Sequence, residues 1–413
     1  MNMAKKDRIY YGWVVVVAFL FIGIISYGIN YSYGVFFKSL LQHFDWSRTL
    51  TSGLFSSYML LQCVFAILGG WTLDRYGARI VFILMGFFTG LSLLLTSHAN
   101  APWHLFVSYS LLLAIGIGPI YTVTMATAAR WFVVRRGLAL GIVGAGAGLG
   151  IAAMTPIAAH LVSTYGWQNA YFIMGLVALA TITPCALVLR KTPTAVTPLA
   201  DGESLTDTSH VVSQKQNPDG SDSFSLIQAV KTRNFWLLLS VWFLYAFCLH
   251  LVLVHLTPHA IDLGTGPMKA ATFLGLIGGI SIPGRIFMGR FSDIIGRKQA
   301  GIISALFMAG AMLLLAVGSK LWLLYLFSVI FGLSYGGIDP PIVALIGDAF
   351  GTRHMGVILG VLVVGWSAGG AAGPALAGYI FDVSGNYVYA FLAAMVAMVI
   401  ATILIFLVRQ SRR

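Results

Sequence analysis

The sequence predicts an all-α membrane protein with twelve transmembrane helices in two pseudo-symmetric six-helix halves. Its 413 residues are 58% hydrophobic and only 9% charged, and their mean hydropathy is +0.87. Soluble domains carry about 25% charged residues, so this composition excludes a soluble enzyme, a disordered chain and a nucleic-acid module. The apolar residues also fall into stretches of membrane-spanning length, and the second half of the chain repeats features of the first.

Twelve stretches reach the roughly 20 apolar residues that a helix needs to cross the hydrocarbon core. In chain order they cover residues 11–37, 51–73, 79–98, 103–128, 138–162, 168–189, 234–260, 270–291, 299–317, 321–346, 355–380 and 387–408. The first is too long for a cleaved signal peptide and therefore counts as a span. The polar segment 190–232 is expected to be a flexible linker between an N-terminal half, 1–189, and a C-terminal half, 233–413.

The basic residues orient the predicted bundle. All Lys and Arg residues except Lys38, Arg48, Lys269, Lys320 and Arg285 fall on the side that holds both termini. Because basic residues concentrate on the cytoplasmic side, both termini are expected in the cytoplasm. The net charge of +12 then reflects topology and not a nucleic-acid surface. All three cysteines lie inside apolar stretches, so neither a disulfide framework nor a metal site is expected.

The two halves align with each other without a gap. One shift places the loop Asp74-Arg75-Tyr76-Gly77-Ala78-Arg79 on Asp293-Ile294-Ile295-Gly296-Arg297-Lys298 and also places Gly166 on Gly385. Parallel repeats of this kind occur in transporters, where an axis along the membrane normal relates the halves. The repeat therefore predicts a substrate site between the halves, near the middle of the membrane.

Several motifs carry a resemblance to a known family. The loop Gly70-x-x-x-Asp74-Arg75-x-Gly77-x-Arg79, echoed at 289–298, resembles the signature loop of the major facilitator superfamily. Within that superfamily the chain resembles the monocarboxylate transporters and the bacterial oxalate/formate antiporters at Tyr11-Gly12-Trp13, Ser26-Tyr27-Gly28, Gly34-Val35-Phe36-Phe37-Lys38, Arg130-Trp131-Phe132, Arg135-Arg136-Gly137-Leu138-Ala139 and Gly284-Arg285. In type it is most similar to a bacterial lactate transporter, which implies a multi-pass protein of the bacterial inner membrane.

The charged loops at the membrane rim are expected to form a conformational latch. Its predicted members are Asp74, Arg75, Arg79, Asp293 and Arg297. Acid and base at these positions can pair with neighbouring helix ends and hold one conformation until the pairing breaks. The alternative is that the basic residues only set the topology.

Arg285 is the sharpest single signal for function. An arginine inside a span costs about 2.5 to 17 kcal/mol and is a functional candidate by default. The positions three and four residues away on the same helix are Ser281, Ile282, Met288 and Gly289, and none of them is acidic. A guanidinium without a local counter-ion can offer its planar fork to a carboxylate. In the resembled family the arginine on helix eight binds the substrate carboxylate, which implies the same role here.

Acids on other helices leave an alternative open for Arg285. Asp339, which precedes two prolines, or Asp262 could form a structural ion pair with it. Asp339 and Asp262 are also candidates for carrying a coupled proton. His250 is a third candidate, because histidine titrates near physiological pH.

Polar and aromatic residues near mid-span complete the predicted substrate site. Tyr121 and Tyr335 each offer a hydroxyl to a carboxylate and a ring to a short apolar tail. His250 and its repeat mate Tyr31 are expected to face the central cavity from opposite halves, with Asn30 as a further candidate beside Tyr31. Packing within the helix bundle is the alternative for each of these residues.

Two departures from the resembled families shape the expected substrate. Many monocarboxylate transporters have a lysine in helix one and an aspartate shortly before the helix-eight arginine, where this chain has Tyr31 and Ser281. Their proton route therefore does not carry over. Oxalate transporters add a lysine on helix eleven, but residues 357–378 contain neither Lys nor Arg. A single buried cation favours a monoanion such as lactate or pyruvate.

These observations predict a secondary transporter that moves a small monocarboxylate with a proton by alternating access. It is expected to be a monomer without a cofactor or metal. Anion antiport of the oxalate/formate type is the alternative. A membrane receptor would need a signalling domain, which neither the termini nor the linker supplies. An enzyme is not expected, because no phosphate-binding loop, nucleophile elbow or metal-spaced group is present.

Overall fold

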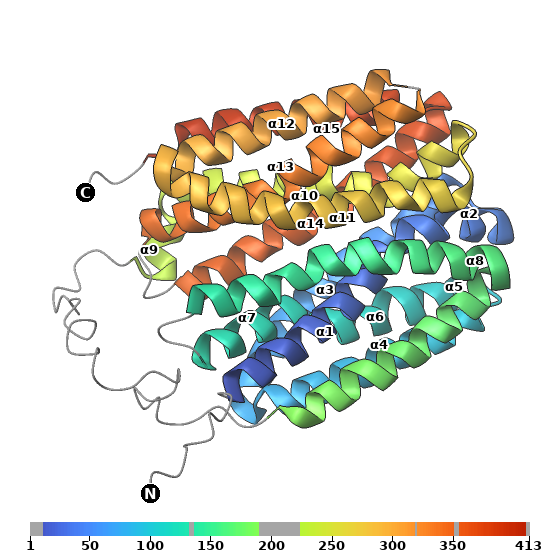
Figure 1. Ribbon diagram of the computed structural model, residues 1–413, viewed down its shortest axis with the longest axis horizontal. Helices are drawn as coiled ribbons and strands as arrows, with labels where there is room; N and C mark the ends of the chain where they lie inside the picture. The colour runs from blue at the N-terminus through green and yellow to red at the C-terminus, as the bar shows by residue number, and fades with distance from the viewer. Residues whose placement is uncertain (1–10, 132–135, 190–223, 319, 351–354, 410–413) are drawn as a thin grey trace, which may run out of the picture.

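The protein is a bundle of long helices in the computed structural model, which describes residues 11–131, 136–189, 224–318, 320–350 and 355–409 (Figure 1). The first part of the chain forms α1 (Tyr11–Tyr31), α2 (Tyr33–Phe44), α3 (Arg48–Tyr76), α4 (Ala78–Ser97), α5 (Pro102–Leu105), the π-helix η1 (Phe106–Leu112), α6 (Leu113–Ile117), α7 (Ile120–Trp131) and α8 (Arg136–Val188). The second part forms α9 (Leu226–Val230), α10 (Arg233–Asp262), α11 (Pro267–Ile295), α12 (Arg297–Val317), α13 (Leu321–Phe350), α14 (Met355–Ser384) and α15 (Val388–Leu407). The predicted all-α membrane fold is confirmed.

Eleven of the described helical segments are long and apolar enough to cross a bilayer. One of them, Ala139–Val188, lies in α8, where Gly166 has non-helical angles of φ 80° and ψ 164°. Glycine adopts such a positive φ without the steric penalty of a Cβ atom. The chain therefore reverses at Gly166, and α8 contains the two separate spans that the sequence predicts there.

Two buried apolar clusters follow the two halves of the chain. One cluster lies mainly within residues 15–189 and the other within 229–408. Figure 1 shows α1 to α8, in blue and green, beside α10 to α15, in yellow to red. Much of the predicted linker lies outside the described residues, but its last part forms α9, with a capping box between Ser225 and Gln228.

The halves meet along close helix contacts. Helix α8 packs on α11, and α3 packs on α14. A Cβ atom on Gly278 of α11 would lie 2.5 Å from Cβ of Ile151 in α8, so this crossing needs a glycine. Small residues allow membrane helices to approach closely. The interface is therefore tight where α8 crosses α11.

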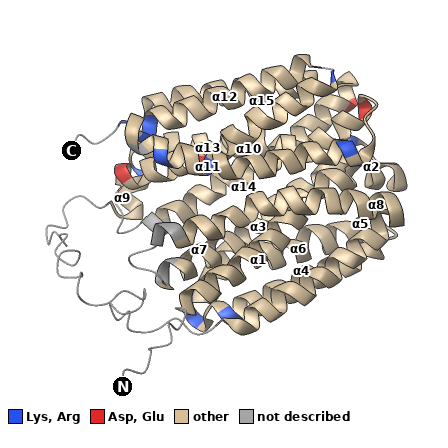
Figure 2. Cartoon of the chain, viewed as in Figure 1, with Lys and Arg blue, Asp and Glu red and all other residues tan. Residues whose placement is uncertain are grey.

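Charged residues gather toward the two ends of the bundle (Figure 2). We call the end where α1 begins and α15 ends the proximal end, and the opposite one the distal end. At the distal end Asp262 of the C-terminal half forms ion pairs with Lys38 (2.6 Å) and Arg48 (2.8 Å) of the N-terminal half. Asp382 of α14 accepts hydrogen bonds from the backbone N–H groups of Arg48 (3.0 Å) and Thr49 (2.8 Å). These contacts, the distal cluster, hold the halves together at this end.

The latch predicted at the proximal end is only partly described. The side chains of its two aspartates lie outside the described residues. Arg75 lies 5.6 Å from the ring centroids of both Trp71 and Tyr76. Arg297 forms an ion pair with Asp348 of α13 and therefore ties two helices of the same half. Arg79 is exposed, and the latch stays a prediction.

Candidate functional site

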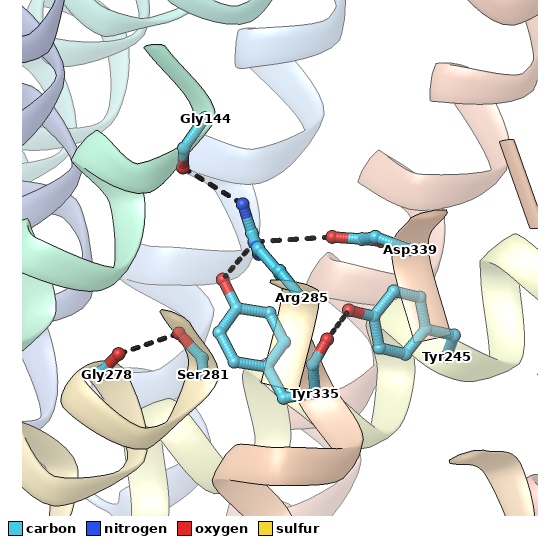
Figure 3. Close-up of polar contacts among 7 residues, drawn as sticks. All are labelled: Gly144, Tyr245, Gly278, Ser281, Arg285, Tyr335 and Asp339. Atoms are coloured by element: carbon cyan, nitrogen blue, oxygen red, sulfur yellow. Dashed lines mark hydrogen bonds and ion pairs between the residues drawn. The ribbon is translucent and has the colours of Figure 1, made fainter. Parts of the chain in front are cut away.

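Arg285 joins the two halves near the middle of the bundle (Figure 3). Its Nη1 donates to the carbonyl oxygen of Gly144 in α8, 2.9 Å away in the other half. Its Nη2 contacts Oδ2 of Asp339 at 3.3 Å and the hydroxyl of Tyr335 at 3.4 Å, both on α13. Of the two acids considered as its partners, Asp339 is the one that the structure brings to Arg285.

Close packing of α11 on α13 positions this arginine. A Cβ atom on Gly336 would lie 2.0 Å from the carbonyl oxygen of Ser281, and one on Gly284 would lie 2.6 Å from that of Leu333. At both positions the close neighbour is backbone, and both contacts lie within about one helical turn before Arg285 on α11. The hydroxyl of Ser281 donates to Gly278 of its own helix at 2.7 Å. Ser281 therefore does not take the place of the acid that the resembled transporters carry there.

Tyrosines from several helices surround the arginine. The ring centroid of Tyr335 lies 5.5 Å from Cζ of Arg285, and the hydroxyl of Tyr245 donates to the backbone carbonyl of Tyr335 at 3.2 Å. Tyr121 is 39% exposed and lies within electrostatic reach of both Arg285 and Asp339. Both predicted tyrosines are thus close to the arginine.

A second aromatic group lies beside this site. Tyr31 stacks on Tyr27 at 6.0 Å between ring centroids and lies 6.1 Å from the ring of His250. The His250 ring packs edge-on against Trp366 at 5.3 Å, and its Nδ1 donates to the carbonyl of Ala246 at 2.9 Å. His250 is only 1% exposed. His250 contacts Tyr31 of the other half in a packed setting, and no described contact joins it to Arg285 or Asp339.

Among the buried polar side-chain atoms without a hydrogen-bond partner in the described residues, two belong to the predicted substrate site: Oδ1 of Asn30 and Nε of Arg285. Asn30 is 2% exposed. Buried polar groups are nearly always hydrogen-bonded, so each such atom needs an explanation. The free Nε is a donor on the residue that the sequence singles out. No described contact brings Asn30 to the arginine.

Asp262 lies apart from this site, in the distal cluster with Lys38 and Arg48. Its two ion pairs give it a role in joining the halves at that end. Within the described residues, no three His, Cys, Asp or Glu side chains are grouped so as to hold a metal ion.

The sequence interpretation did not identify Tyr245, Tyr27 or Trp366 as neighbours of the site. Tyr27 lies within electrostatic reach of Arg285, and its spacing of one helical turn from Tyr31 was an available signal. Tyr245 and Trp366 are brought in by tertiary packing, with ring centroids 5.2 Å apart. The Gly144 carbonyl is a backbone group, which side-chain reasoning cannot identify.

Comparisons with known proteins agree with this architecture. The family model of the Major Facilitator Superfamily matches residues 19–317 and 281–413. Monocarboxylate transporter 13 of Bos taurus is 27% identical over 386 residues, which cover 93% of this chain and 86% of that protein. Monocarboxylate transporter 11 of Homo sapiens is 26% identical over 392 residues, covering 92% and 79%.

A solved structure shares the fold. It is a bacterial homologue of the human lysosomal transporter Spinster, in an inward-facing and unoccupied conformation. The TM-score is 0.78 at 15% sequence identity, and the match covers 98% of each chain. At this identity the likeness shows the fold alone.

Proposed function

This chain belongs to the major facilitator superfamily, and we propose that, as a secondary transporter of that family, it carries a small monocarboxylate such as L-lactate or pyruvate together with a proton. Its relationship to monocarboxylate transporters 11 to 13, at about a quarter identity, supports this substrate class.

We further propose that the protein lies in a bacterial inner membrane, with both termini in the cytoplasm. In this orientation the distal cluster closes the outer side, and we propose that the site opens toward the cytoplasm.

The observation that carries the proposal is Arg285 between the two halves. A planar guanidinium binds a carboxylate with two parallel hydrogen bonds, and this geometry is specific for planar anions. The hydroxyl of Tyr335 lies 3.4 Å from Nη2 and Tyr121 lies within electrostatic reach, so both tyrosines are available for further hydrogen bonds to a substrate. Helix α14 supplies no Lys or Arg. A site with one cation suits one carboxylate.

Transport then follows from what the contacts between the halves must do. Arg285 bonds both to its own half, at Asp339, and to the other half, at Gly144. A substrate carboxylate on the guanidinium competes with both contacts and changes the balance between the closed and open arrangements. Opening of the outer side requires the distal cluster to separate. We propose that the halves, 1–189 and 233–413, rock as units joined by the linker 190–232.

Anion exchange of the oxalate/formate type is a second candidate. Tyr31 and Ser281 stand where many monocarboxylate transporters have their lysine and aspartate, and this departure favours a mechanism without a coupled proton. Exchange predicts strong stimulation by anion on the opposite side and little response to a pH gradient.

Uptake of radiolabelled L-lactate into sealed proteoliposomes tests the proposal. Wild type, Arg285→Ala and Lys269→Ala are compared with and without an inward proton gradient. Lys269→Ala removes an exposed cation from the same helix and serves as the matched control. We expect gradient-driven uptake in wild type and the control, and its loss in Arg285→Ala.

Uptake that survives in Arg285→Ala would overturn the role of the arginine as anchor. Absence of lactate uptake in wild type, combined with oxalate/formate counterflow, would replace the symport proposal with exchange.

A further inference from the structure

We infer that Asp339 is the group that binds the coupled proton, and that it does so because the substrate carboxylate displaces it from Arg285. This inference rests on the proposed function and assigns its proton to one of the three candidate side chains. It makes Asp339 the resting counter-ion of the arginine and the competitor of the substrate.

The contact between Arg285 and Asp339 is loose enough to be displaced. Nη2 and Oδ2 are 3.3 Å apart, whereas strong charge-assisted pairs have distances of about 2.7 to 2.9 Å. The same Nη2 also donates to the hydroxyl of Tyr335 at 3.4 Å, so Asp339 shares this donor group with Tyr335. A carboxylate with better alignment on the guanidinium fork can therefore replace Asp339.

Solvent exposure distinguishes Asp339 from His250, the other candidate proton carrier near mid-span. The side chain of Asp339 is 32% exposed and that of Arg285 is 24% exposed, so water can deliver a proton to the pair. His250 is 1% exposed and enclosed by aromatic rings, and its Nδ1 is used by the Ala246 carbonyl. The third candidate, Asp262, is held by two cations in the distal cluster.

The backbone around Asp339 is only partly fixed by helical hydrogen bonds. Pro340 and Pro341 lack N–H groups, so the carbonyls of Gly336 and Gly337 receive no bond from them. The neighbouring carbonyl of Tyr335 accepts a hydrogen bond from the hydroxyl of Tyr245 on α10. α13 therefore lacks two backbone hydrogen bonds beside Asp339, which lowers the cost of a local shift that moves this residue away from Arg285.

Charge balance requires the proton. The resting pair of Arg285 and Asp339 is neutral, and an incoming carboxylate would leave one uncompensated negative charge in the interface. Such a buried charge is costly. A proton from water that binds to a carboxyl oxygen of Asp339 restores neutrality, and the same O–H bond breaks when the substrate leaves on the other side.

No other group around Asp339 is suited to this titration. Within the described residues, the titratable or charged side chains that interact with it are Arg285 on α11, Tyr335 on α13, Tyr245 on α10, Tyr27 on α1 and Tyr121 on α7. Arginine stays protonated in proteins, and tyrosine ordinarily titrates near pH 10. Asp339 is therefore the member of this group that can take up a proton when a substrate carboxylate displaces it from Arg285.

Calorimetric titration with L-lactate measures how many protons the transporter takes up when it binds the substrate. Binding heats of the purified, detergent-solubilised transporter are recorded in buffers of different ionisation enthalpy, from about pH 5 to about pH 9, and their slope gives the protons taken up per lactate. Wild type should reach a maximum near one. Asp339→Asn should bind lactate with no uptake at any pH, and at the alkaline limit about tenfold more tightly than wild type, because its competitor has lost its charge.

Two controls make the result specific. Asp339→Glu and His250→Gln should each retain proton uptake. Uptake in Asp339→Asn, loss of uptake in His250→Gln, or failure of a folded Asp339→Asn to bind lactate would each overturn the inference. Wild type that binds lactate without taking up a proton at any pH would also overturn it. Absence of lactate binding in wild type would instead contradict the substrate class in the proposed function.

Discussion

Asp382 of one half caps the helix that contains Thr49 in the other half. Its Oδ2 accepts from the backbone N–H of Thr49 at 2.8 Å and from the Thr49 hydroxyl at 2.5 Å. Ser47 is the local N-cap of α3, but it satisfies only the N–H of Leu50. The first N–H groups of a helix have no partner inside the helix. The start of α3 is therefore completed only when the halves are closed at the distal end.

Asp382→Asn should weaken this closure. Replacing the carboxylate by an amide removes its charge and one of the two oxygens that accept from Arg48 and Thr49. Loss of one such hydrogen bond costs about 0.5 to 1.5 kcal/mol, so the distal end should open about 2- to 12-fold more often. The readout is labelling of Ser56→Cys by a membrane-impermeant maleimide, in a background without the three native cysteines. Ser56 is buried between the halves, where its hydroxyl donates to the Ala371 carbonyl.

Asp45→Asn is the matched control for Asp382→Asn. Asp45 is exposed at the same end of the bundle and ends α2, so it loses the same charge without removing the cap. Equal labelling in the two variants would contradict the role of Asp382 in closure.

Arg48 and Asp262 should show coupling in the same labelling assay. Arg48 forms an ion pair with Asp262 at 2.8 Å, and its guanidinium lies 3.6 Å from the ring centroid of Phe381. Removing either partner alone should raise labelling, and the double variant should raise it by less than the product of the two effects. We expect a coupling free energy of about 1 kcal/mol, because neighbouring charges are not independent. Strictly additive effects would show that the pair does not contribute to closure.

The fold could be predicted from the sequence because membrane spans depend on local composition. A stretch such as 299–317 is apolar over its whole length and becomes α12 with nearly the same bounds. The turn at Gly166 was also accessible, because the repeat places it on Gly385, and both have positive φ. The break after Tyr31, where α1 gives way to α2, was not predicted, although Gly28 and Gly34 lie on either side of it.

The site could be predicted only as far as its charged residues. Arg285 stands out because a charge inside a span is costly, whatever the fold. Its contacts with Asp339 and the Gly144 carbonyl depend on the crossing of α11 with α13 and α8, which a single sequence does not determine. The pairing of Asp382 with the start of α3 depends in addition on which end of the bundle is closed.

Tyr335→Phe should reduce lactate affinity without loss of fold. It removes the hydroxyl that lies 3.4 Å from Nη2 of Arg285 and keeps the ring that packs near the guanidinium. Losing a hydrogen bond to a charged group costs about 1.5 to 3 kcal/mol, so the Kd should rise by about 10- to 150-fold. Tyr325→Phe, an exposed position on the same helix, should leave the Kd unchanged.

Gly336→Ala should abolish lactate binding by separating α11 from α13. The new methyl group would lie 2.0 Å from the Ser281 carbonyl oxygen, a backbone atom that cannot move alone. Either the helices separate and carry Arg285 away from Asp339, or the fold loses stability by about 1 to 3 kcal/mol from overpacking. Lactate titration and thermal unfolding, measured on the same preparation, distinguish these two results.

Gly310→Ala is the control for that substitution. A Cβ atom there has no neighbour within 4 Å, and alanine is favoured over glycine inside a helix by about 0.5 to 1 kcal/mol. Its Tm should therefore stay the same or rise, and its lactate affinity should match wild type. If Gly336→Ala behaved in the same way as Gly310→Ala, the close approach of α11 and α13 would not be what positions Arg285.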